Sequence, residues 1–152
     1  MRLTSPAFSS DGEIPCKYTC DGENMSPPLI ISDVPLEAAS LVLIMDEPEP
    51  PKGASVVDHW LVFDIPPGEQ YVPEGEGPEG TNGTIAAGKV RYHGPCPSED
   101  EHRYRFQLYA LDVELPLPEQ TTRKDIEKAM AGHLLARAEM TGRYEMRFAC
   151  NL

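Results

Sequence analysis

The feature that most limits how this chain can fold is an apolar run that leads directly into acids and prolines. Leu41–Met45 are consecutive apolar residues, as expected for a buried strand. The following segment, Asp46–Pro51, consists only of acids and prolines. Because proline fixes its own φ and favours extended geometry in the residue before it, Glu47 and Glu49 are expected to be extended and restrained. The sequence therefore predicts a buried strand that ends in a stiff acidic loop.

A second strand is predicted from His59 to Ile65, so that a histidine lies where the strand begins. Successive side chains of a strand point to opposite faces of the sheet. The alternation predicts one face made of His59, Leu61, Phe63 and Ile65 and another made of Trp60, Val62 and Asp64.

A third strand is predicted over residues 102–112, and it too begins with a histidine. A rigid bend precedes it, because Gly94-Pro95-Cys96-Pro97 places two prolines within four residues. One face of the strand is expected to carry His102 and Tyr104 together with Phe106, Leu108 and Ala110.

The remaining elements are predicted from composition and periodicity. Residues 66–83 are crowded with Gly, Pro and Glu and predict a mobile acidic surface loop. Apolar residues recur every fourth position between Thr122 and Ala138, which predicts a helix that Thr122 and Asp125 cap and that Gly132 weakens or breaks in two. Residues 142–148 alternate as a last strand.

Length and charge restrict the class of protein. The 152 residues are sufficient for a single domain spanning residues 1–152. The 16 prolines are spread along the chain, which is typical of many strands joined by shaped loops and predicts a mostly β fold. A net charge of −12 argues against nucleic acid and against an anionic membrane surface as partners, so an anion would have to be bound locally.

The four cysteines and the N-terminal segment bear on the cellular compartment. The start of the chain has no apolar stretch like a signal peptide, and no run approaches a membrane span, so a cytoplasmic location is expected. In that compartment Cys16, Cys20, Cys96 and Cys150 are expected to be thiols, with disulfides or a structural zinc site as alternatives.

The polar groups could form one site if the strands that start at His59 and His102 are neighbours. A carboxylate of Asp46 or Glu47 would then orient an imidazole, and the imidazoles with backbone N–H groups of the Gly94 bend would offer donors to an oxyanion such as phosphate. Each residue also has a structural interpretation. A histidine at a strand start can be a hydrogen-bonded structural residue, and the two acids can be a solvated strand end.

Three blocks of the sequence carry a resemblance to a known family. They are Asp21–Leu29, Asp46–Pro51 with His59-Trp60 after it, and Gly94–Pro97 with His102–Tyr104 after it. In this order they resemble the signature blocks of the phosphatidylethanolamine-binding protein family, most closely its bacterial and archaeal branch, which is similar to the Raf kinase inhibitor protein.

The resemblance implies a mostly β fold, a Greek-key β-sandwich with one or two short helices near the C-terminus, and a small anion pocket. The family's pocket aspartate corresponds to Glu47, with Asp46 directly before it, so either acid could be the pocket carboxylate. The resemblance implies these ligand-binding residues: Asp46, Glu47, Pro51, His59, Gly94, Pro95, His102 and Tyr104.

The function expected from these observations is binding of a phosphate-bearing small molecule, such as a phospholipid head group, or of a phosphorylated protein, with regulation of a kinase or another partner. No cofactor, metal, nucleic acid or stable membrane insertion is expected, and a homodimer is conceivable. The alternative is a metal-dependent or acid–base hydrolase that uses the same histidines and carboxylate. A third interpretation is a scaffold whose partner surface is the acidic segment 69–80.

Overall fold

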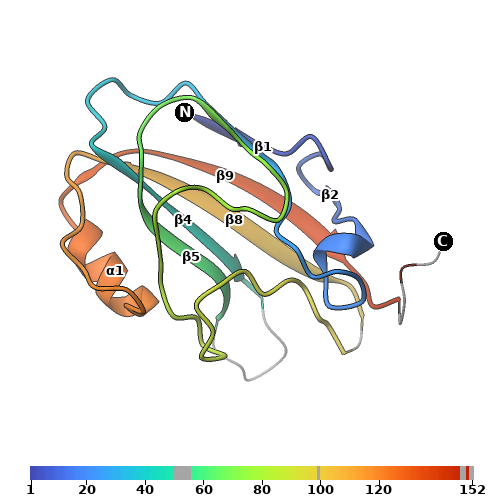
Figure 1. Cartoon of the computed structure of the whole chain (residues 1–152). Helices are drawn as coiled ribbons and strands as arrows, with labels where there is room; N and C mark the ends of the chain where they lie inside the picture. Colours follow the sequence, from blue (N-terminus) through green and yellow to red (C-terminus); the bar gives the residue numbers. More distant parts are fainter. Residues whose placement is uncertain (50–55, 99, 148–149, 151–152) are drawn as a thin grey trace.

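Short strands and one α-helix follow one another along the part of the chain that the structure describes (Figure 1). The computed structural model describes residues 1–49, 56–98, 100–147 and 150. In chain order the elements are β1 (Arg2–Thr4), β2 (Gly12–Glu13), a 3-10 helix (Cys16–Tyr18), β3 (Leu29–Ser32), β4 (Ser40–Glu47), β5 (Val57–Ile65), β6 (Gln70–Val72), β7 (Thr81–Asn82), β8 (His102–Leu111), α1 (Arg123–Met130) and β9 (Leu134–Tyr144).

The strands form two sheets, which confirms the predicted sandwich. The larger has six strands in the order β2-β9-β8-β4-β5-β7, and the smaller has three in the order β1-β3-β6. β4 pairs antiparallel with both β5 and β8, so the end of β4 meets the beginnings of its two neighbours at one end of the sheet. The strands that begin near His59 and at His102 are therefore both adjacent to the strand that ends in Glu47.

β4 is buried along its whole length because both of its faces are covered. Leu43 and Met45 face the smaller sheet and belong to the core between the two layers. Val42 and Ile44 face the opposite way and pack in a second core together with Ile126 of α1. A strand covered on both faces needs apolar residues at every position, which explains the uninterrupted run in the sequence.

β5 departs from the predicted alternation at two places. Its register against β4 shifts twice, and each shift adds one residue to β5. Trp60, Val62 and Ile65 all lie in the core between the sheets, whereas Leu61 and Phe63 lie in the core under α1. The prediction that His59 and Ile65 share a face with Leu61 and Phe63 was therefore wrong, because a β-bulge next to each of them resets the two-residue period.

The C-terminal helix is shorter than predicted. α1 ends at Met130, and Gly132, with φ of +84°, turns the chain into β9. The prediction of helix up to Ala138 was wrong because residues 134–144 pair with β8 along nearly its full length. The predicted helix cap was also wrong: the Thr122 side chain makes no capping hydrogen bond to any residue that the structure describes.

The Gly/Pro/Glu-rich segment 66–83 is built into the fold more than its composition predicted. β6 pairs with β3 in the smaller sheet, and β7 pairs with β5 in the larger. Between them Glu74 accepts hydrogen bonds from the Tyr18 hydroxyl at 2.7 Å and the Lys17 ammonium at 2.9 Å. These contacts hold the segment against the N-terminal part of the chain, so the prediction of a mobile surface loop was wrong.

The cysteines form two disulfides, Cys16–Cys150 and Cys20–Cys96, so the expectation of four thiols was wrong. Cys16 and Cys20 lie in one short segment, and each binds a residue distant in sequence. The Cys20–Cys96 bridge joins this segment to the Gly94 bend. In the part of the chain that the structure describes, no helix is long and apolar enough to cross a membrane.

The disulfides lead to a prediction about stability. The Cys20–Cys96 bridge closes a long loop, with a sequence separation of 76 residues, and a loop of this size removes much chain entropy from the unfolded state. Replacing both cysteines by serine is expected to lower the free energy of unfolding by about 2–4 kcal/mol. Urea denaturation without reductant measures the change. The double variant Cys16→Ser/Cys150→Ser, which removes the other disulfide, is measured beside it for comparison. Equal midpoints for oxidised wild type and both variants would contradict the prediction.

Candidate functional site

Three polar side chains meet where β4 ends and β5 and β8 begin. Glu47 and His59 are only 6% and 5% exposed, and the His102 side chain is 17% exposed. A carboxylate oxygen of Glu47 contacts Nδ1 of His102, and its other oxygen lies 3.9 Å from Nε2 of His59. The structure thus brings the two histidines predicted from sequence around one carboxylate.

His59 reaches this position because of the β-bulge at the start of β5. Met45 pairs with Trp60 and Asp46 pairs with Asp58, so His59 is the extra residue between these two pairs. Its ring turns toward Glu47 on the face of the sheet that carries Tyr104. Bulges are common beside functional sites because the extra residue can re-aim a side chain.

Fixed neighbours hold the His59 ring. Its Nδ1 lies 2.6 Å from the backbone oxygen of His93, and the edge of the ring meets Tyr104 with ring centroids 5.3 Å apart. A carbonyl oxygen only accepts hydrogen bonds, so Nδ1 carries the proton in every charge state of the ring. Burial and the Glu47 carboxylate raise the pKa of Tyr104, which keeps its hydroxyl protonated.

Buried polar atoms point to an incomplete site. Among the described residues, Nε2 of His59 has no hydrogen-bond partner. Oε1 of Glu47 and Nδ1 of His102 touch one another but lack hydrogen-bond geometry with any described group. Each unpaired buried polar atom costs about 1–3 kcal/mol. A ligand that supplied a partner to His59 Nε2 would recover this cost for that atom.

The acid directly before Glu47 lies on the other face of the sheet. Asp46 is fully buried and binds the guanidinium of Arg105 at 2.8 and 3.0 Å and that of Arg123 at 2.8 Å. Arg123 also binds Asp58 at 2.7 Å, which ties α1 to β4 and β5. Burial lowers the pKa of Arg123, but its hydrogen bonds to the two aspartates outweigh burial and raise it. The structure therefore places Glu47, and not Asp46, beside the imidazoles.

The Gly94 bend is fixed against the loop that follows the 3-10 helix. The N–H of Gly94 donates to Oδ1 of Asn24 at 2.8 Å and is not available to an anion, so the expectation that it would donate to an oxyanion was wrong. A Cβ at this position would lie 2.2 Å from the backbone oxygen of Tyr18, which explains the glycine. Pro95 accepts a hydrogen bond from the N–H of Cys20 at 3.1 Å through its carbonyl. Gly94 and Pro95 therefore contribute to the site by holding the bend in place, not by a contact that the structure shows with Glu47 or the imidazoles.

Two contributors were not singled out from the sequence. The His93 carbonyl fixes the His59 tautomer, and Asn24 holds the bend. Asn24 has φ of +56°, and asparagine is one of the few residues that tolerate this conformation. Its position after Asp-Gly in a turn-rich segment was the available signal. Pro51, predicted to bind ligand, lies outside the described residues.

Within the described ranges, no group of three or more His, Cys, Asp or Glu side chains is arranged to hold a metal ion. The chemistry that the arrangement offers is hydrogen bonding to a small polar group. His59 Nε2 can donate when protonated and accept when neutral, and Glu47 only accepts when ionised.

Comparisons with known proteins agree with this fold. The family model described as phosphatidylethanolamine-binding protein matches residues 4–145. A UPF0098 protein of Methanothermobacter thermautotrophicus is 46% identical over 150 residues, covering 95% of this chain and 98% of the relative.

Two solved structures share the fold over almost the whole chain. CT736 of Chlamydia trachomatis, described as a homolog of phosphatidylethanolamine-binding protein, superposes with a TM-score of 0.91 at 44% identity, covering 96% of this chain and 97% of that one. YbcL of E. coli, described as a new member of the mammalian family, gives 0.86 at 26% identity, covering 96% and 98%.

The opposite positions of the two acids give a prediction. Asp46→Asn leaves two arginines without their shared buried carboxylate and is expected to lower the free energy of unfolding by about 3 kcal/mol. Glu47→Gln keeps the shape of a side chain that makes no such cluster and is expected to change it by less than about 1 kcal/mol. Urea denaturation of both variants at pH 7 is the measurement. A larger loss in Glu47→Gln than in Asp46→Asn would contradict these assignments.

Proposed function

The chain belongs to the phosphatidylethanolamine-binding protein family, and from this premise we propose that it is a binding module for small ligands that carry a phosphate group. The observation that carries the proposal is the buried Nε2 of His59, which has no partner among the described residues and lies 3.9 Å from Glu47. Ligand-binding pockets are lined mostly by apolar side chains, and a few such polar groups fix the orientation of the ligand.

The donor and acceptor pattern favours phosphate over other anions. Protonated His59 offers an N–H donor through Nε2, whereas ionised Glu47 offers only acceptor oxygens. A fully deprotonated anion would be repelled by this carboxylate. A phosphate monoanion carries both a P–O⁻ acceptor for an imidazole and a P–OH donor for Glu47, so it satisfies both groups.

The biological use of such binding is part of the proposal. A phosphorylated protein would present the required phosphomonoester. A phospholipid head group would present it where its phosphate is a monoester, since a phosphodiester has no P–OH to donate to Glu47. Control of a kinase or another partner would follow from capturing such a group. The net charge of −12 disfavours adsorption to an anionic bilayer, which supports capture of individual head groups. A cytoplasmic location and a homodimer also stand as proposals. The two disulfides count against a cytoplasmic location in a mesophilic cell, where thiols are kept reduced.

A hydrolase is the second candidate, and one contact favours it. A carboxylate that touches an imidazole, as Glu47 touches His102, is the arrangement by which enzymes orient a general base. Incubation with p-nitrophenyl phosphate and p-nitrophenyl acetate tests this candidate. Turnover that is lost in His102→Asn would favour the enzyme over the binding module.

The binding proposal predicts a pH dependence that differs between anions. Histidine is the side chain whose ordinary change of charge falls in the range from pH 8 to 5.5, and an imidazolium donates hydrogen bonds through both ring nitrogens. Sulfate has no proton to offer neutral His59 or Glu47, and its affinity is expected to fall about tenfold or more from pH 5.5 to 8, the equivalent of one charge-assisted hydrogen bond. Phosphate is expected to bind more tightly than sulfate at both values. Titration calorimetry measures both.

Two histidine variants control this experiment. His59→Asn retains an amide that can donate to the His93 carbonyl but removes Nε2, and it is expected to abolish the pH dependence and most of the affinity. His133→Gln is the matched control, because His133 binds Asp112 at 2.8 Å, its side chain is 42% exposed, and it lies away from the candidate site. Phosphate affinity unchanged in His59→Asn would refute the proposed function.

A further inference from the structure

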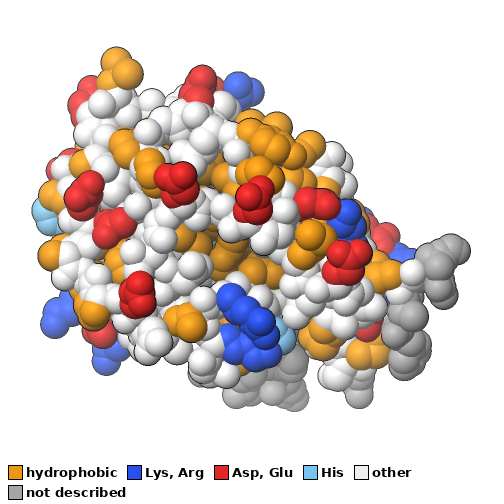
Figure 2. Space-filling model, viewed as in Figure 1, with side chains coloured by type: hydrophobic (Ala, Val, Ile, Leu, Met, Phe, Trp, Pro, Cys, Tyr) orange, Lys and Arg blue, Asp and Glu red, His pale blue; other side chains and the backbone are white. Residues whose placement is uncertain are grey.

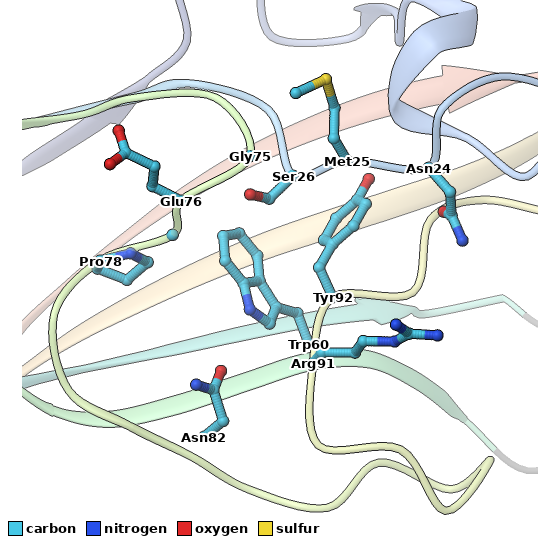
Figure 3. Close-up of a pocket in the computed structure, with 11 residues that line it drawn as sticks. Asn24, Met25, Ser26, Trp60, Gly75, Glu76, Pro78, Asn82, Arg91 and Tyr92 are labelled. Carbon is cyan, nitrogen blue, oxygen red and sulfur yellow. The ribbon is translucent and has the colours of Figure 1, made fainter.

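A cavity of about 210 Å³ is lined by residues that are next to His59 and His93 in the chain (Figure 3). Trp60, which follows His59 in β5, and Tyr92, which precedes His93, meet edge to face in its wall with ring centroids 5.2 Å apart. Asn24 lines the cavity too, and the same side chain holds the N–H of Gly94. The cavity therefore shares its walls with the segments that position the His59 ring.

Two charged side chains, Arg91 and Glu76, line the cavity. Arg91 is exposed and extends along one side of the cavity, while the carboxylate of Glu76 lies on the opposite side, as Figure 3 shows. The two aromatic rings lie between them, and Met25 lies on the far side of the rings beside Ser26 and Asn24. The cavity wall thus carries one cation and one carboxylate, and both aromatic rings and polar side chains line the rest of it.

Arg91 has no acidic partner within the described ranges, although the protein is strongly acidic. Most basic side chains there are in ion pairs, including Arg2, Lys17, Arg103 and Arg143. Ion pairs with the described residues are missing only for Lys89, Arg91, Lys124 and Lys128.

Two of these four cations lie on the loop that carries His93, and the other two lie on α1. The ring of His93 stacks parallel on that of His59 with centroids 6.1 Å apart. Burial lowers the pKa of His93, and the positive charges of Lys89, His59 and Arg91 lower it further. Figure 2 shows basic side chains beside a histidine on this face, below a hollow, with acidic side chains scattered elsewhere.

From the cavity and the cation on its wall we infer that the Arg91 side is a second anion subsite, so that the ligand is a small phosphomonoester bearing another negatively charged group, such as a carboxylate. This inference rests on the proposed function, because the phosphate is taken to sit at His59. Arginine suits the role since its planar guanidinium binds a carboxylate through two parallel hydrogen bonds. The apolar surface of Trp60 and Met25 would contact the carbon chain between the two groups.

The inference makes a choice among ligands that share a phosphate. A cationic substituent, such as the ammonium of phosphoethanolamine, would be repelled by Arg91. Phosphoglycolate has a similar size and carries a carboxylate instead. At pH 6 and low salt, phosphoglycolate is expected to bind about three- to tenfold more tightly than phosphoethanolamine, the equivalent of one partly exposed charge-assisted contact.

Titration calorimetry with orthophosphate, phosphoethanolamine and phosphoglycolate tests this on the full chain. Arg91→Gln is expected to bring phosphoglycolate to the affinity of phosphoethanolamine while leaving orthophosphate within about twofold, because an exposed arginine that contacts only the substituent does not hold the phosphate. Lys124→Gln is the matched control: it removes the same charge from a position on α1 and is expected to keep the preference.

The outcomes separate the two proposals. If orthophosphate does not bind, the proposed function fails and the subsite fails with it. If orthophosphate binds but phosphoglycolate gains nothing over phosphoethanolamine, only the subsite is overturned. A preference that disappears equally in Arg91→Gln and Lys124→Gln also overturns the subsite, because it would then reflect net charge alone.

Discussion

Adjacent carboxylates that point to opposite faces of one strand set the arrangement at this end of the molecule. Asp46 joins β4 to β8 and α1 through two guanidinium groups, and Glu47 faces the two imidazoles. Asp58 on β5 shares Arg123 with Asp46, so this cluster of two aspartates and an arginine lies next to the bulge that contains His59. A buried ion cluster costs desolvation, and its well-attested benefit is a fixed register. Here that register determines where the site histidine points.

Most of the fold could be predicted from local pattern, because the strands carry their own signals. The buried run in β4 and the alternation in β8 are confirmed by the burial of Leu43 and Phe106. The bulges in β5 could not be predicted, since a bulge depends on pairing with a neighbouring strand and leaves little trace in its own residues. The first half of β9 was mistaken for helix because Leu134 and Ala138 fit a helical spacing until β8 offers a partner.

The candidate site was predictable in its side chains and not in its details. Histidines at two strand starts and an acid at a strand end follow from sequence order once the strands are neighbours. Which acid faces the histidines depends on the face of β4 at its last residue, and the sequence alone left Asp46 and Glu47 as alternatives. The role of the Gly94 N–H depends on Asn24, which is 70 residues away in the chain. Contacts of this kind become visible only in three dimensions.

The loops around the candidate site are tied together before any ligand arrives. The Cys20–Cys96 bridge, the Asn24–Gly94 hydrogen bond and the Tyr92 hydroxyl on the Tyr18 carbonyl, at 2.7 Å, join two distant segments. Little backbone conformational freedom is then left to be lost when a ligand binds. Such a rim is preorganised, so the ligand-free and ligand-bound structures should superimpose closely. Differences in residence time between ligands should then arise from the contacts that each ligand makes.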